Sequence, residues 1–503
     1  MDALSQLIDL LTEKEKTDFS LFLSRKNKRE DVKNIDLFNI LKTDDIDSLK
    51  KLYESSKKKD AYHALRKRLH DNLLLFLSQK TFENSNSEVY DALRLVVVGR
   101  FLLENHLSGT GFKCLIKAER LAAQLEQFSL LNEILLLRLQ YAHLNAEENL
   151  EELSEKFLIN QKHLQHEAKL NLAYAFLRQE LHNIHLKGKV INLTDLIAAT
   201  IKKHHISVND LMTYKSLYQI LFIANEYAAI YQNYSLIEPY IRKSYQFIQS
   251  RKESSEYHLF HHLHILYYLA NFNLRNRLFI DSKAYLKQLR ELMEIQKPYY
   301  QLFYLRYQLL LALNEHFSGN KQDALKIIQD ALQSAGKKYK QEDLDDLQLC
   351  LTMFLAQHND STCLRHLAKL THSDAWYEKK LGMLWAIRKN LMEILIHAQF
   401  GNIDLATSRL QSFKRRYKKY LLTTNEKKVM DYVNLVEKSL HKPDSVFEKY
   451  FQKDVMNLLE TKENDDIFNL SFIGWLIAKW KKETPYKTTI DLLFERGKAE
   501  SGK

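Results

Sequence analysis

Residues 319–332, Gly-Asn-Lys-Gln-Asp-Ala-Leu-Lys-Ile-Ile-Gln-Asp-Ala-Leu, decide the fold of this chain. Gly319 and Asn320 form a turn signal, because both residue types tolerate positive φ angles better than most. Small or apolar residues then recur at helical spacing on one face: Ala324, Leu325, Ile328, Ala331 and Leu332. A helix, a tight turn and a second helix make a helical hairpin. Such a hairpin cannot bury its apolar face alone, so the pattern predicts neighbouring hairpins.

Similar hairpin signals occur on both sides of this stretch. Residues 401–406, Gly-Asn-Ile-Asp-Leu-Ala, repeat the Gly-Asn-x-x-x-Ala pattern. Asn359 and Asp360 form another turn signal, and residues 281–284 open a similar helix. Equivalent small positions lie 40, 39 and 43 residues apart, at Ala284, Ala324, Cys363 and Ala406. We therefore predict an all-α superhelical solenoid of antiparallel helix pairs with a period of about 40 residues.

The stretch 319–332 resembles the second helix of a tetratricopeptide repeat, which has glycine in the turn and small alanine positions in that helix. Pro298, fourteen residues after Ala284, lies near the place where that family ends a unit with proline. The resemblance covers about residues 230–440 and implies a superhelical array of hairpins. The sequence departs from the family in its longer period and in lacking the Trp-x-x-Leu-Gly opening of the first helix. No ligand-binding residues match, so the resemblance implies none here.

The composition favours helices throughout the chain. Only 11 glycines and 4 prolines occur in 503 residues, well below the usual ~7% and ~5%. Sheets with many tight turns need these residues, whereas long helices do not. The chain is 45% hydrophobic, with 27 Tyr and 25 Phe, so it has enough apolar material to bury a large core.

Charge and cysteine content indicate the kind of partner and compartment. The formal charge of +11 and pI of about 9.1 favour acidic partners without selecting among proteins, nucleic acids and anionic membranes. The three cysteines form no Cys-x-x-Cys pair and no even disulfide framework. The first residues lack the basic and apolar segments of a signal peptide, and no apolar run reaches the ~18 residues of a membrane span. We therefore expect a cytoplasmic protein and no membrane partner.

Three regions are predicted: a small helical domain over 1–80, the repeat array over 88–460, and a C-terminal capping helix with a tail over 461–503. The first region resembles the N-terminal part of uncharacterised helical-repeat proteins from Bacteroidota, to which no activity is attached. Thr12 and Glu15 form a capping box at the start of its second helix. This region either caps the array or binds DNA through a helix-turn-helix-like module, with Arg66, Lys67 and Arg68 near the start of the recognition helix.

The strongest local excess of positive charge lies in Phe413-Lys414-Arg415-Arg416-Tyr417-Lys418-Lys419-Tyr420. Basic side chains interleaved with aromatic rings are typical of nucleic-acid binding, with Lys414, Arg415, Lys418 and Lys419 as the candidate phosphate contacts. The three rings recur at i, i+4 and i+7, which also predicts an ordinary core stripe opposite a solvated basic face.

A tyrosine cluster is the second candidate partner site. Tyr300, Tyr304 and Tyr307 share one helical face, and Arg306 stands beside them. In a solenoid the first helix of each hairpin commonly lines the concave surface, where exposed tyrosines make good anchors for a partner. Packing of the three rings in the core is the alternative interpretation.

No constellation for catalysis, a cofactor or a metal emerges from the sequence. Gly109-Thr110-Gly111 lacks the Gly-Lys-Ser/Thr ending of a phosphate loop and is predicted to be a turn between helices. His258, His261, His262 and His264 lack a third ligand at a useful spacing and are predicted to be ordinary surface or groove histidines. Cys363 is predicted to be a buried, inert thiol. The sequence thus predicts a non-enzymatic scaffold that binds a protein or peptide, with a nucleic-acid-associated regulator as the alternative.

Overall fold

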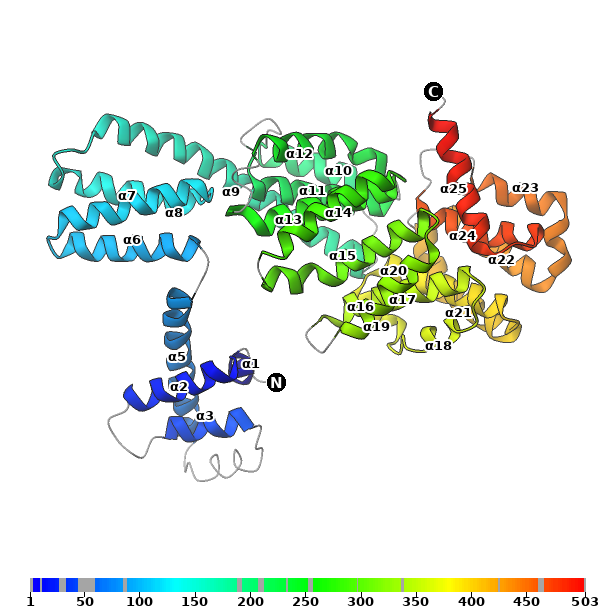
Figure 1. The fold of residues 1–503 in the computed structure, drawn as a ribbon, viewed down its shortest axis with the longest axis horizontal. Helices are drawn as coiled ribbons and strands as arrows, with labels where there is room; N and C mark the ends of the chain where they lie inside the picture. The colour runs from blue at the N-terminus through cyan, green and yellow to red at the C-terminus, as the bar shows by residue number, and fades with distance from the viewer. Residues whose placement is uncertain are drawn as a thin grey trace. The chain divides into compact units, whose positions relative to one another are not determined.

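The structure is a computed structural model in which every regular element of the described residues is a helix (Figure 1). The predicted all-α class is therefore confirmed. The structure describes residues 3–9, 11–26, 33–43, 59–84, 88–187, 192–206, 212–231, 234–251, 257–295, 297–335, 339–423, 426–459 and 466–501. The sequence also predicts a basic, helix-breaking stretch at 25–29 and helices at 46–53 and 208–231. Of these, residues 27–29, 46–53 and 208–211 lie outside the described ranges.

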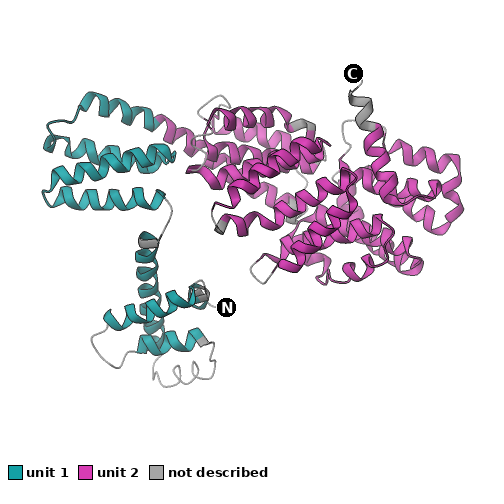
Figure 2. Cartoon of the chain, in the orientation of Figure 1, with its two compact units in different colours: residues 1–161 teal, residues 162–503 magenta. Residues whose placement is uncertain are grey.

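The chain divides into two compact units, residues 1–161 and 162–503 (Figure 2). Unit 1 contains α1 (Ala3–Asp9), α2 (Glu13–Lys26), α3 (Lys33–Thr43), α5 (Lys59–Asn84), α6 (Glu88–Glu104), α7 (Ser108–Gln124), α8 (Phe128–Tyr141), η1 (Ala142–Leu144) and the start of α9 (Leu150–Lys187). The remainder of α9 belongs to unit 2.

Unit 2 continues with helices that are mostly joined by short turns. They are α10 (Leu193–Lys203), α11 (Tyr214–Tyr231), η2 (Tyr234–Ile237), α12 (Glu238–Ser250), α13 (Leu259–Arg275), α14 (Phe279–Met293), α15 (Lys297–Phe317), α16 (Lys321–Ser334), α17 (Gln341–Gln357), α18 (Cys363–Leu367), α19 (Asp374–Lys380), α20 (Met383–Gln399), α21 (Ile403–Thr423), α22 (Lys427–His441), η4 (Pro443–Phe447), α23 (Lys449–Asn457), α24 (Ile467–Lys481) and α25 (Pro485–Ser501).

The N-terminal helices α1, α2, α3 and α5 enclose a core of their own. Ile8, Phe19, Phe38 and Leu69 are among its fully buried side chains. The predicted capping box is confirmed, because the Thr12 amide donates to Glu15 Oε2 at 2.8 Å and the Glu15 amide donates to Thr12 Oγ1 at 3.3 Å. The polar residues at 81–87 also predict a break between the first region and the array, but α5 continues to Asn84.

Two glycines bring α6 and α7 together, and they correct the predicted turn at residues 108–111. α7 already begins at Ser108, and the turn lies earlier, with His106 at φ 63°. A Cβ on Gly111 would lie 2.9 Å from Leu103 Cγ, and one on Gly99 would lie 2.9 Å from Leu115 Cδ2. Gly111 is therefore a helix-packing residue, and the absent side chain allows the close approach.

Four hairpin turns of unit 2 each use one residue with positive φ; the sequence predicted turns at three of them, 319–320, 359–360 and 401–402, but not at Arg277. These residues are Arg277 (65°), Gly319 (100°), Asn359 (60°) and Gly401 (79°). The amide that follows each of them donates to a carbonyl five residues earlier; Asn320 N, for example, donates to Glu315 O at 2.9 Å. This bond closes the C-terminus of the first helix and directs the chain into the second.

The small residue after each turn lies at a close helix contact, but one predicted position is wrong. Ala324, Cys363 and Ala406 are fully buried, whereas Ala284 is exposed. Ser282 takes the buried position, because its hydroxyl donates to Ala270 O at 2.8 Å and accepts from Asn314 Nδ2 at 2.9 Å. A small polar side chain can thus replace alanine where backbone and amide groups need a partner.

The C-terminal helix α24, in the region predicted to hold a capping helix, is docked on its neighbours. Leu470, Leu476 and Trp475 are buried, and Trp475 Nε1 donates to Gln399 Oε1 at 3.0 Å. Past Arg496 the sequence predicts a frayed tail, but α25 continues to Ser501.

Candidate functional site

The first helices of successive hairpins in unit 2 pack against one another. α11 contacts α13, α13 contacts α15, α15 contacts α17, and α17 contacts α20. We call their joined side chains the first-helix face, defined by Tyr218, His261, His264, Phe303, Arg306, Asp343, Asp346 and Trp385. Because helices that are not consecutive in the chain supply it, residues far apart in the sequence meet there.

One end of the first-helix face is aromatic. The Tyr218 ring lies 5.6 Å from His261 and 4.9 Å from His264, measured between ring centroids. The His264 ring in turn lies 4.7 Å from Phe303. Tyr218 and His261 stay partly exposed, while His264 and Phe303 are buried. The exposed edges of such rings are suited to stacking against aromatic or cationic groups of a partner.

The other end of the face is polar and charged. Arg306 Nε lies 3.3 Å from Asp343 Oδ1, and Trp385 Nε1 donates to Asp346 Oδ1 at 2.6 Å. The Arg306 side chain remains 36% exposed despite its ion pair. A guanidinium held in this way can still donate to a carboxylate or carbonyl of a partner.

Three of the four clustered histidines are buried, whereas the sequence predicted surface or groove positions; His261 alone of the four is partly exposed. His258, His262 and His264 are buried because α13 is packed against α11, α12, α14 and α15. His258 stacks on Tyr214 at 4.6 Å, and His264 Nδ1 is 2.8 Å from the Phe260 carbonyl oxygen. Burial lowers the pKa of His261 and of His262 to about 4, so these imidazoles are neutral at neutral pH. They are part of the packing between aromatic helices.

The predicted tyrosine cluster separates into two environments. Tyr300 and Tyr304 stack at 5.3 Å, and Tyr304 Oη lies 3.2 Å from Ser334 Oγ near the end of α16. Tyr307 is buried. Arg306 pairs instead with Asp343 of α17. Tyr300 and Tyr304 therefore remain candidates for partner contact. Tyr307 is a core residue, as the alternative interpretation predicts.

The basic segment of α21 has the predicted core stripe, since Phe413 and Tyr417 are buried and Tyr420 is partly buried. Lys414 Nζ pairs with Glu437 at 2.7 Å, and Arg416 pairs with Glu378 at 2.6 Å. The remaining basic side chains are exposed: Arg415, Lys418 and Lys419. Intramolecular acids thus neutralise part of the positive face.

Asp346 is the most strongly perturbed acid of the first-helix face. Burial raises its pKa to about 7, the nearby Asp343 adds to this effect, and the hydrogen bond from Trp385 opposes it. Asp345 and Arg306 also lie within electrostatic reach. The carboxyl group is therefore partly protonated near neutral pH, when it can donate as well as accept a hydrogen bond.

Asp346→Asn is expected to stabilise the protein at pH 8 by about 1–3 kcal/mol. The pKa of Asp346 in the folded state lies above its unfolded value of 3.8. Between these two pH values the folded state binds more protons than the unfolded state. The contribution of Asp346 to the free energy of unfolding therefore falls as the pH rises. Asparagine removes the cost of ionisation and can still accept from Trp385. Urea unfolding at pH 8 and pH 5 should show the gain shrinking at the lower pH. The exposed control Asp323→Asn should change little, and a gain independent of pH would contradict the assignment.

Sequence reasoning missed Tyr218, Asp343, Asp346 and Trp385. Arg306 and Asp343 are 37 residues apart, and Asp346 and Trp385 are 39 apart. The available signal was therefore a separation close to the predicted period of about 40 residues, applied to polar residues.

Other classes of site have little support in the described part of the chain. No group of three or more His, Cys, Asp or Glu residues there could hold a metal ion. Burial raises the pKa of the Cys363 thiol to about 12, which agrees with the predicted inert cysteine. None of the described helices combines the length and apolar character needed to cross a membrane.

Comparison with protein-family models and with curated proteins gives no match for this sequence. Function must therefore be inferred from the arrangement of the side chains.

Proposed function

We propose that this protein is a non-enzymatic scaffold whose unit 2 is a helical solenoid that binds a protein or peptide. The turns at Arg277, Gly319, Asn359 and Gly401 support this proposal, because they follow one another at intervals of 42, 40 and 42 residues. A period near 40 is also the one that the small packing positions indicate. The relation to tetratricopeptide repeats remains a resemblance in this proposal.

The observation that carries the proposal is a set of hydrogen bonds between residues about one period apart. They join His316 with Gln357, Asn359 with Gln399, Tyr432 with Phe472, Ser439 with Lys479, and Asn225 with Asn271. Separations of 40, 41 and 46 residues mean that equivalent places in neighbouring hairpins touch. Repeated contacts of this kind are typical of solenoids, which present an extended surface for partners.

The first-helix face is the surface that we assign to the partner. Its aromatic end supplies Tyr218 and its polar end supplies Arg306, the residue types that most often anchor protein interfaces. A peptide with both an aromatic and an acidic side chain would complement these two ends. We include Tyr300 and Tyr304, which also lie on α15, in the proposed partner site.

A nucleic-acid-associated regulator is the second candidate. Its support is the exposed set Arg415, Lys418 and Lys419 on α21, together with the exposed Lys67 and Arg68 on α5. The ion pairs of Lys414 and Arg416 reduce the charge available to phosphates. This candidate requires binding that weakens steeply with salt, since phosphate contacts release counterions.

The test is affinity capture with the full chain, with and without nuclease, followed by binding measurements with the purified captured protein. The double variant Tyr218→Ala/Arg306→Ala should weaken that binding about tenfold or more, because it removes both anchors. Tyr450→Ala/Arg242→Ala is the matched control, since both side chains are highly exposed elsewhere in unit 2.

Equal binding by the two double variants would exclude the first-helix face as the partner site. Capture that disappears after nuclease treatment would favour the nucleic-acid candidate instead. Circular dichroism melting of both variants separates loss of binding from loss of folding.

A further inference from the structure

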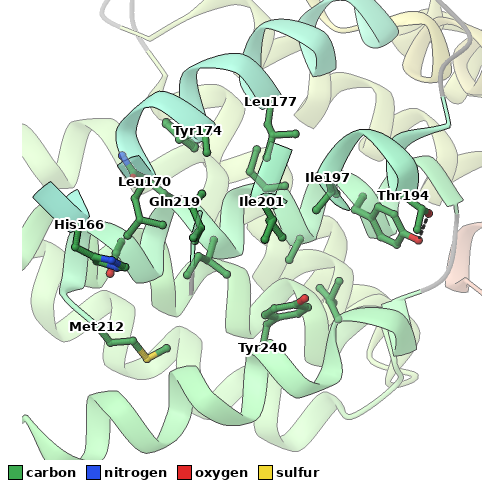
Figure 3. Close-up of a pocket in the computed structure, with 18 residues that line it drawn as sticks. His166, Leu170, Tyr174, Leu177, Thr194, Ile197, Ile201, Met212, Gln219 and Tyr240 are labelled. Atoms are coloured by element: carbon green, nitrogen blue, oxygen red, sulfur yellow. Dashed lines mark hydrogen bonds between the residues drawn. The ribbon is translucent and has the colours of Figure 1, made fainter. Parts of the chain in front are cut away.

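Unit 2 contains a cavity of about 330 Å³ near its N-terminal end. α9, α10, α11 and α12 supply its lining, and Figure 3 shows their side chains directed toward a shared space. A volume of this size lies within the range of small-molecule sites and far above that of an ordinary packing void.

The lining is mostly aliphatic, with three tyrosines and a few polar side chains among its residues. Leu170, Ile197, Ile201 and Ile220 are typical members, and none of the described residues that line it is Asp, Glu, Lys or Arg. An apolar cavity of this kind holds water poorly and takes up apolar molecules. Leaving it empty also costs stability, because its walls lose packing contacts.

Polar groups gather at the two ends and along one side of the cavity. At one end the Thr194 hydroxyl lies 2.8 Å from the Tyr227 hydroxyl, and His166 lies toward the other end (Figure 3). Between them Gln219 donates its amide to Asn171 at 2.9 Å. The Thr194–Tyr227 pair can exchange a hydrogen bond with a ligand hydroxyl or carbonyl.

We propose that this cavity binds a linear aliphatic molecule of about ten carbons that ends in an uncharged polar group. A water molecule has a share of roughly 30 Å³ in the liquid, and a methylene group is of similar size, so the volume matches a chain of this length. The polar end lies beside Thr194 and Tyr227. An anionic end group is disfavoured because none of the described lining residues is Lys or Arg, so no permanently cationic side chain among them offsets its desolvation.

The test uses 1-decanol and decanoate as probes in thermal unfolding of the full chain. Decanol should raise the Tm of the wild-type protein by about 2–5 °C, while decanoate should not. Ile201→Phe fills the cavity, so it should raise the Tm without ligand and abolish the decanol response. Ile280→Phe is the matched control, because Ile280 is 86% exposed, and it should respond like the wild type.

Thr194→Val provides a second variant that keeps the size of the side chain but removes its hydroxyl. It should weaken decanol binding about fivefold, measured by titration calorimetry, because one hydrogen bond is lost. No wild-type response, or an equal response in Ile201→Phe, would overturn the site. If decanoate raised the Tm as much as decanol does, the inference that the ligand ends in an uncharged group would be wrong.

Discussion

Asp466→Ala is expected to destabilise unit 2 by about 3–5 kcal/mol, the largest effect that we anticipate for a single substitution. The Asp466 side chain is 1% exposed and accepts from Arg275 Nη1 at 2.7 and 2.6 Å. Arg388 Nη2 lies 3.8 Å from the same carboxylate. Alanine would leave the largely buried guanidinium group of Arg275 (α13) and the partly exposed one of Arg388 (α20) without their shared anion. Removing one partner of a buried ion pair costs far more than the pair contributes.

Urea unfolding followed by tryptophan fluorescence measures this effect selectively. All four tryptophans lie in unit 2, at positions 376, 385, 475 and 480. Asp466→Asn should show a smaller loss, because the amide keeps an acceptor oxygen. Glu238→Ala disrupts the exposed pair with Arg242 and should cost no more than ~1 kcal/mol. A similar small cost for Asp466→Ala would show that the two arginines are well solvated.

Ala324→Leu should destabilise the protein by about 1–3 kcal/mol through overpacking. Ala324 is fully buried near the start of α16, where α15 approaches closely. The matched control is Ala284→Leu, because sequence reasoning treats both alanines as equivalent, whereas Ala284 is exposed. The control should change the unfolding free energy by no more than ~0.5 kcal/mol.

The two alanine variants test whether the buried small position of each hairpin is the one that the sequence spacing predicts or the one that the structure shows. Equal destabilisation would mean that Ala284 faces a neighbouring helix after all. An unchanged midpoint for Ala324→Leu would mean that the α15–α16 contact can open to admit a leucine. The unfolding free energies of both variants are measured by the same urea titration.

Local patterns were enough to predict much of the secondary structure. The positive φ at Gly319 and Gly401, the Thr12–Glu15 capping box and the core stripe through Phe413 and Tyr417 are confirmed. Each depends on interactions within one or two turns of chain, which is why a sequence window contains the information.

Predictions failed where the deciding contact came from another helix. Ser282 displaced Ala284 because Ala270 and Asn314 required a hydrogen-bonding partner. The histidines at 258–264 were predicted at the surface or in a groove, but neighbouring helices bury His258, His262 and His264. Gly111 was assigned to a turn, although its function is to admit Leu103 from α6.

By itself the sequence determined that the chain is helical, that turns at Gly319, Asn359 and Gly401 connect helices, and which faces of several helices are apolar. These properties follow from backbone freedom, capping and helical periodicity, all of which act over a few residues. Only the tertiary structure decided that Asp346 meets Trp385, that Asp466 lies beside Arg275, and that a cavity remains between α9 and α12. Such features depend on the relative placement of helices whose residues are 39 to 191 positions apart, and no local pattern specifies that placement.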